Sequence, residues 1–185
     1  MVDEIHGDAE RRMQKSVEAV TDELKGIRSG KANPALLENI KIDAYGQKQP
    51  LNQLASISVP DPMSLVVQPW DKSILGDVVK AIQTAELGFN PLVEGNFIRV
   101  PVPPLSEERR LELVKLCKKI AEDGKVAVRN IRRDANEKLK KAEKDKEISE
   151  DDQHKGADQV QKSTDKFIRD IDTISAAKEK DLMSI

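Results

Sequence analysis

The chain has 185 residues and a formal net charge of -2, with 35% charged, 38% hydrophobic and only 3% aromatic residues. This balance favours long amphipathic helices, arranged in one large domain or two smaller ones, over a thick globular interior. So few aromatic rings argue against sequence-tolerant binding of single strands by base stacking, but leave recognition of folded RNA by its backbone and shape open.

The first segment is predicted to be a helix. Apolar residues three or four positions apart mark one face from Val2 to Ser29, and Gly30 is expected to stop the helix. The pattern then changes between Lys31 and Pro104 to short extended runs broken by prolines and glycines, which indicate strands. The runs are Ile40 to Tyr45, Ser56 to Val59, Leu65 to Gln68 and Phe97 to Val100. A helical interval from Ile74 to Ile82, ending at Gly88, completes a small α+β module.

Two more helices are expected after the prolines at 101, 103 and 104. Ser106 would cap the first, with acidic residues in its first turn, and nothing obvious breaks it before Asp145, although Gly124 should cost about 1 kcal/mol relative to alanine. Ser149 would cap the second. Its apolar stripe comprises Val160, Phe167, Ile171, Ile174 and Leu182.

An isolated amphipathic helix cannot hide its apolar face, so the three helices should form one bundle that is discontinuous in sequence. The fold class is therefore α+β with two domains: a long three-helix bundle of residues 1–30 and 105–185, and an inserted β/α/β domain of residues 31–104. The two connections would form a hinge. Its residues are Gly30, Lys31, Ala32, Asn33, Pro34, Pro101, Val102, Pro103 and Pro104.

The stretch from Lys125 to Lys141 sets seven positive charges against two negative ones. Its arginines fall on the helix side opposite the expected apolar stripe. Arg129 and Arg132 have no acid three or four positions away, and only Arg133 has such a partner, Glu137. We therefore expect an anionic partner. The alternative is that acids from neighbouring helices neutralise this face.

The sequence shows no constellation typical of an enzyme. His6 and His154 lack neighbours at metal-ligand spacing and are expected at the surface, and no catalytic carboxylate pair, cofactor or metal site is apparent. Gly26 to Ala32 fails as a phosphate-binding loop in spacing, chemistry and context. Trp70 is either a recognition aromatic or, as we expect, a core residue. No membrane span or signal peptide is evident, so we expect a cytoplasmic protein. We also expect it to be a monomer.

Four segments together resemble the bacterial ribosome recycling factor family. They are IRSGKANP at 27–34, IRVPVPPLSEERR at 98–110, VRNIRRDAN at 128–136 and KDKEISEDD at 144–152. The resemblance implies an L-shaped molecule whose bundle and smaller domain are joined by a flexible hinge. It further implies binding of the post-termination ribosome through large-subunit ribosomal RNA. Elongation factor G and GTP would then drive dissociation into subunits and release of messenger and transfer RNA.

By this resemblance, Arg28, Arg129 and Arg132 contact RNA, with Arg110 and Arg133 in support. Lys31 stands where the family usually has arginine, so it keeps the charge but loses the bidentate fork. The factor would not be an enzyme and would bind no small-molecule substrate and no membrane. A hypothesis from a different class remains open at this point: a helical scaffold or chaperone that binds other proteins and pairs its arginines within the fold.

Overall fold

The computed structural model describes residues 1–85 and 88–184, which form two compact units. The bundle unit comprises Met1–Arg28 and Glu107–Ser184, and the small unit comprises the described residues of Ser29–Ser106. The boundaries between the two units, expected at 30/31 and 104/105, therefore lie two residues further out on each side, at 28/29 and 106/107. Both connecting stretches belong to the small unit because the flanking helices end at Gly26 and begin at Glu107.

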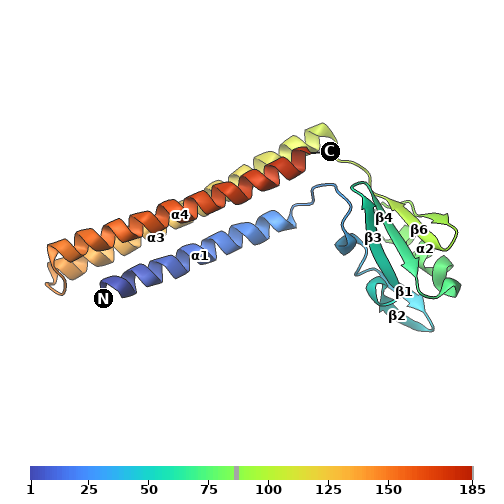
Figure 1. The fold of residues 1–185 in the computed structure, drawn as a ribbon, viewed down its shortest axis with the longest axis horizontal. Helices are drawn as coiled ribbons and strands as arrows, with labels where there is room; N and C mark the ends of the chain where they lie inside the picture. Colours follow the sequence, from blue (N-terminus) through green and yellow to red (C-terminus); the bar gives the residue numbers. More distant parts are fainter. Residues whose placement is uncertain (86–87, 185) are drawn as a thin grey trace. The chain divides into compact units, whose positions relative to one another are not determined.

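The bundle unit consists of three helices that pack pairwise along their lengths (Figure 1). They are α1 (Val2–Gly26), α3 (Glu107–Lys144) and α4 (Glu150–Met183). The expected extension of α1 to Ser29 is wrong. Gly26 weakens the last turn, and the next residue, Ile27, already has extended backbone with φ -78° and ψ 116°. The predicted cap of α4 is confirmed: Ser149 and Asp152 form a reciprocal capping box.

Apolar residues spaced by three and four fill the bundle core, and glycines let the helices approach. A Cβ on Gly124 would overlap the Cγ2 methyl of Val20 and lie 3.4 Å from Cδ1 of Ile171. A Cβ on Gly156 would lie 2.9 Å from Cγ1 of Val2. The glycine that looked like a weakness of α3 therefore marks a three-helix contact. The buried members of α3 are Leu113, Cys117, Ala121, Gly124, Val128, Ile131, Ala135, Leu139 and Ala142.

A polar contact ties α1 to α4 within the bundle. His6 Nε2 lies 2.9 Å from the buried Ser163 hydroxyl, which in turn donates to Glu10 Oε1 at 2.8 Å. The expectation that His6 is a surface residue is wrong, since it is half-buried between two helices. His154 does lie exposed on α4. The contact satisfies the Ser163 hydroxyl inside an otherwise apolar seam.

The small unit contains a two-stranded and a four-stranded antiparallel sheet, the latter in the order β3-β4-β6-β5 (Figure 1). The strands are β1 (Lys41–Ala44), β2 (Gln47–Pro50), β3 (Ala55–Asp61), β4 (Ser64–Pro69), β5 (Leu92–Glu94) and β6 (Phe97–Pro101). Short 3-10 turns cover Pro34–Leu36, Leu51–Gln53 and Lys72–Ile74, and helix α2 covers Leu75–Thr84. Four strands match predicted runs. The polar β2 and the exposed β5 carried no alternating pattern and were missed.

Two predicted ends in the small unit differ from the structure. Helix α2 stops at Thr84 rather than Gly88, because Ala85 is already extended. Strand β1 stops at Ala44, because Tyr45 and Gly46 have φ of 55° and 75° and form the two-residue turn into β2. Two consecutive positive φ angles are typical of the type I′ turn, whose twist suits a hairpin.

The core of the small unit gathers side chains from the sheets, α2 and the turns. Its fully buried members include Leu37, Ile42, Leu51, Leu65, Val67, Val78, Ile82, Ile98 and Val100. Trp70 is not among them: 68% of this residue is exposed. The expectation that the one tryptophan is a core residue is therefore wrong, since aliphatic side chains fill this interior without it.

Candidate nucleic-acid interface on the helical bundle

The expected RNA-contacting arginines of the bundle unit lie on α3 and just after α1. Arg28 is exposed two residues beyond the end of α1, and Arg110 is half-buried near the start of α3. Arg129 and Arg132 are half-buried and Arg133 is exposed, all on α3. At about 1.5 Å per residue, α3 spaces Arg110 and Arg133 roughly 35 Å apart. The helix thus fixes the axial separations of the residues that carry these guanidinium groups.

The pairing of Arg129 differs from the sequence expectation. Its Nη1 donates to Oε1 of Glu122 at 2.9 Å, and Glu122 lies two helical turns earlier. Acids three or four positions away are the usual intrahelical partners, but two long side chains can also meet across two turns. Glu122 is exposed, and the hydrogen bond from Arg129, followed by that from Lys125, holds its pKa below the usual glutamate value. Arg129 is therefore partnered within its own helix.

Lys125 is neutralised by acids on two helices. Its Nζ lies 3.0 Å from Oδ1 of Asp172 on α4 and 3.1 Å from Oε2 of Glu122. Only 19% of its side chain is exposed. The bond to Asp172, the largest cause, raises the pKa of Lys125. Lys125 therefore joins α3 to α4, and contributes little positive charge to the surface.

The positive charge of Arg132 is not neutralised by any described acid. Its Nη1 donates to the amide oxygen of Gln161 on α4 at 3.2 Å, and Gln161 donates in turn to Asp165 at 2.8 Å. A neutral amide orients the guanidinium without cancelling its charge. Within residues 1–85 and 88–184, no carboxylate lies within 4.0 Å of Arg132. Arg132 is thus oriented by hydrogen bonding but not electrically neutralised.

Arg133, Arg28 and Arg110 also lack an ion pair in the described part of the chain. The pair expected between Arg133 and Glu137 is not formed, so the side chain extends into solvent. The Nε of Arg110 is buried and has no hydrogen-bond partner among the described residues. The neighbouring Arg109, by contrast, pairs with Glu112 at 2.7 Å.

Two other charged residues of α3 form ion pairs with α1. Asp134 accepts from Arg12 at 2.8 Å and Lys138 lies 3.5 Å from Asp8. Ion pairs therefore join α3 to both neighbouring helices, to α1 through Asp134 and Lys138 and to α4 through Lys125, whereas Arg132 meets a neutral amide on α4. Sequence reasoning missed Glu122, Gln161 and Asp172, and only the acid seven positions before Arg129 left a signal in the sequence.

The expected hinge residues lie in the small unit, as does half-buried Lys31. Ala32 N donates to Pro62 O at 2.7 Å, and Val102 N donates to Met63 O at 2.8 Å. Gly30 has φ +77°, and a Cβ there would lie 2.7 Å from Cγ of Leu105. Both connecting segments are thus hydrogen-bonded to the same β3–β4 turn, inside the small unit.

Other site chemistries find no support among the described residues. No group of three or more histidine, cysteine, aspartate or glutamate side chains there could hold a metal ion. Cys117 is buried in the core. No described helix is long and apolar enough to cross a membrane.

Comparison with known proteins gives one consistent family. The sequence model described as ribosome recycling factor matches residues 20–183. The chain is similar to the ribosome-recycling factor of Syntrophomonas wolfei, with 53% identity over 185 residues and all of both chains covered. It is also similar to that of a Geobacillus species, with 54% identity over 185 residues and all of both chains covered.

Solved structures agree. A solution structure of the ribosome recycling factor matches with a TM-score of 0.69 and 45% identity, covering 100% of this chain and 98% of that one. A second match has a TM-score of 0.61 and 43% identity, and covers all of both chains. It is described as models for the T. thermophilus ribosome recycling factor and the E. coli elongation factor G bound to the E. coli post-termination complex. The α+β, two-domain fold class is confirmed by these matches.

Proposed function

The chain belongs to the ribosome recycling factor family, and on that premise we propose that it binds the post-termination ribosome and, with elongation factor G and GTP, promotes its dissociation into subunits. Messenger and transfer RNA are released for another round of translation. The bundle unit binds large-subunit ribosomal RNA. The protein performs no bond chemistry itself, because its part is to bind and to change which ribosomal contacts are favourable.

The observation that carries the RNA-binding role is the uncompensated charge of Arg132. Its guanidinium is oriented by Gln161, but no described carboxylate neutralises it. A guanidinium fork can bind two phosphate oxygens at once. Because α3 is a continuous helix of 38 residues, the backbone that carries Arg132 and Arg133 needs little further ordering on binding, and the hydrogen bond to Gln161 already orients the Arg132 side chain.

The scaffold hypothesis requires arginines that are paired with acids within the fold. Among the described residues, the structure meets this requirement for one of the expected RNA-contacting arginines but not for the others. Arg129 is paired with Glu122, whereas Arg132 and Arg133 have no carboxylate partner in the described chain. Two unmatched cations one residue apart raise the local positive potential, which favours an anionic partner over a generic protein surface. The RNA-binding role is therefore the better supported of the two.

Co-sedimentation with purified ribosomes across a salt series tests the proposal. Binding should weaken with salt, with log affinity falling against log salt by about 0.7 to 0.9 per phosphate contact. Arg132→Ala should weaken binding roughly tenfold or more, because charge-assisted hydrogen bonds contribute about 1.5 to 3 kcal/mol. Its melting temperature should change little, since the side chain contacts only an exposed amide.

Arg169→Ala is the matched control. It removes an exposed arginine from α4, with the same change in net charge, and should leave ribosome binding nearly intact. Equal losses of ribosome binding from the two substitutions would show that Arg132 contributes only through the net charge of the protein. Salt-insensitive binding that survives Arg132→Ala would support the scaffold hypothesis instead.

We further propose that the small unit moves relative to the bundle during recycling. Elongation factor G can favour dissociation only if two orientations of the units bind the ribosome differently. The flexible positions are expected at the unit boundaries, near Gly30 and Pro103, because Ala32 and Val102 are fastened to the small unit. An engineered disulfide between the units should block recycling but permit ribosome binding, and full recycling by the cross-linked protein would disprove the need for movement.

A further inference from the structure

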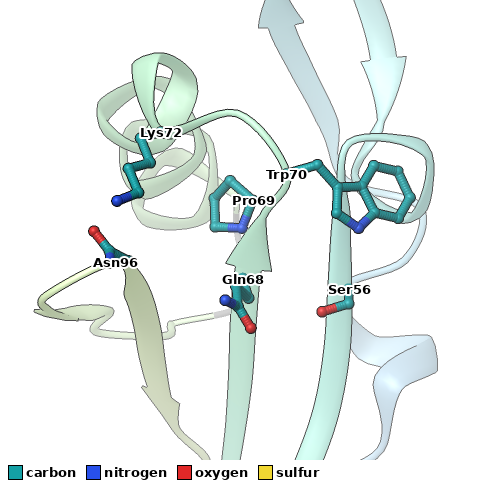
Figure 2. Close-up of a pocket in the computed structure, with 6 residues that line it drawn as sticks. All are labelled: Ser56, Gln68, Pro69, Trp70, Lys72 and Asn96. Carbon is teal, nitrogen blue, oxygen red and sulfur yellow. The ribbon is translucent and has the colours of Figure 1, made fainter.

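A groove on the small unit carries the one tryptophan of the chain. Trp70 follows directly after β4, is 68% exposed, and contributes nothing to the aliphatic core. Figure 2 shows its indole beside β3, above Ser56, with Pro69 and Gln68 between it and the pair Lys72 and Asn96. The exposed indole is therefore available to pack against a ligand, and its significance depends on the groups around it.

The backbone around Trp70 is held on both sides. Its N–H donates to Leu54 O at 3.1 Å, and the next residue, Asp71, accepts from Ser73 N at 2.9 Å. The hydroxyl of Tyr45, from the β1–β2 turn, also donates to Asp71. That bond is the largest cause of both the lowered pKa of Asp71 and the raised pKa of Tyr45. The backbone that carries the exposed indole is therefore fixed, which reduces the entropy lost when a ligand packs against it.

The groove around the indole has a distinctive set of polar groups. It encloses about 350 Å³, and its lining residues are Ser56, Gln68, Pro69, Trp70, Lys72 and Asn96. They offer an aromatic face, a hydroxyl, two amides and one ammonium group. None of these lining residues is a carboxylate, so Lys72 supplies the one charge of the lining itself, while the carboxylate of Asp71, the next residue after Trp70, is already engaged by Tyr45 and Ser73.

These groups match the parts of a nucleotide. A base stacks on an aromatic face, asparagine and glutamine amides pair with the donors and acceptors along a base edge, and an ammonium group binds phosphate. A peptide could also pack against an indole, but it makes no specific use of an ammonium group without a matching acid. The volume lies at the lower end for small-molecule sites, which suits one nucleotide rather than a longer ligand.

We propose that this groove binds a single unpaired nucleotide of an RNA strand, with the base stacked on Trp70 and a phosphate held by Lys72. The site is separate from the arginines of α3, since it lies wholly in the small unit. The inference rests on the proposed function only in naming RNA as the strand, because a ribosome supplies unpaired RNA nucleotides. With so few aromatic rings, the chain is unsuited to stacking along a long single-stranded tract, but one exposed indole suffices for one base.

Fluorescence tests the site directly, because Trp70 is the only tryptophan and every change in indole emission reports this groove. Titration of the full chain with a short single-stranded RNA of mixed sequence should quench the emission saturably. A blunt-ended, fully paired RNA duplex should quench it much less. N-acetyltryptophanamide, titrated in parallel, corrects for absorption and collisional quenching by the RNA.

Variants then separate the contacts. Lys72→Gln should weaken the quenching titration about threefold to tenfold and reduce its salt dependence by roughly one phosphate contact. For the indole itself, anisotropy of labelled RNA is measured in an Arg132→Gln chain, so that the bundle contributes less. There Trp70→Ala should weaken binding roughly tenfold, and Trp70→Phe should retain most of it, since a phenyl ring still stacks.

Two results would overturn the proposal. One is the absence of saturable quenching by single-stranded RNA. The other is quenching by a proline-rich peptide but not by RNA, which would assign the groove to a protein partner. Either result leaves the ribosome proposal standing, because that proposal is judged by co-sedimentation and Arg132. Conversely, loss of the Arg132 effect on ribosomes would not alter the emission of Trp70.

Discussion

The backbone of Gly124 in α3 lies so close to Val20 of α1 that a Cβ at position 124 would overlap the Cγ2 methyl of Val20. Gly7, also inside a helix, has no such neighbour within 4 Å. The two glycines share a helical backbone but differ in surroundings. Replacing each glycine by alanine therefore measures helix propensity alone at position 7, and helix propensity together with packing between helices at position 124.

Gly124→Ala should lower the free energy of unfolding of the bundle. Overpacking costs about 1 to 3 kcal/mol, and the better helix propensity of alanine recovers at most about 1 kcal/mol. Gly7→Ala should raise it by roughly 0.5 to 1 kcal/mol, because nothing opposes the added methyl group. Urea denaturation followed by circular dichroism measures both. A stabilising effect of Gly124→Ala equal to that of Gly7→Ala would contradict the close contact.

Glu122→Gln should strengthen ribosome binding. The carboxylate of Glu122 lies 2.9 Å from Nη1 of Arg129, so an RNA phosphate must compete with it for the same guanidinium. An exposed ion pair contributes about 0.2 to 1 kcal/mol, which predicts an affinity gain of up to about fivefold in co-sedimentation.

Asp123→Asn provides the control for Glu122→Gln, because it makes the same charge change at the next residue, which is exposed. It should produce a smaller gain. The gain from Glu122→Gln should also disappear when Arg129 is replaced by glutamine. A gain that persists without Arg129 would show that Glu122 acts through general charge and not through this pair.

Stability of the α3–α4 turn should depend on acid pH through Asp152. Hydrogen bonds from Ser149, chiefly its side chain, lower the pKa of Asp152 in the folded chain. A lowered folded pKa means that the stabilisation is present above the unfolded value, near 3.9, and is lost as the pH falls through the folded pKa. Ser149→Ala should cost about 1 kcal/mol at neutral pH and flatten this acid dependence. Unfolding midpoints from pH 7 to pH 2 test this, and parallel curves for the two proteins would contradict it.

Cys117 should react with thiol reagents only when the bundle opens. The residue is 0% exposed, and burial raises the pKa of its thiol. Since the thiolate is the reactive form, both effects suppress labelling of the folded chain. The raised pKa also means that the thiol favours folding less as the pH rises above its unfolded value, near 8.5. Labelling rates across a urea series should follow global unfolding, whereas rapid labelling in native buffer would contradict the burial.

The helices were predictable because their apolar residues repeat every three or four positions over long stretches. In α1, Ala9, Met13, Val17, Val20 and Leu24 are all buried as expected. Helix ends were less predictable, since α1 and α2 stop earlier than the next strong breaker. Ile27 is buried as its place in the apolar pattern predicts, but it is already in extended backbone after Gly26, and periodicity alone does not show that the chain leaves the helix there.

The candidate site was predicted by residue type but not by pairing. The cationic segment showed where positive charge accumulates, yet it could not show that Glu122 reaches Arg129 across two turns or that Asp172 on α4 neutralises Lys125. Likewise, the scarcity of aromatic residues led to the prediction that Trp70 is a core residue, and this prediction is wrong. Side-chain reach and contacts between distant segments decide these points.

Periodicity and charge density are local properties, so the three amphipathic helices, the inserted module of short strands and the concentration of cations on α3 could all be predicted from the residues alone. Three features emerge only from the folded molecule: which arginines lack an acidic partner among the described residues, why α3 contains a glycine at position 124, and the exposure of Trp70 on the small unit. Each of those depends on residues far apart in the chain, whose proximity is set by how the folded elements pack.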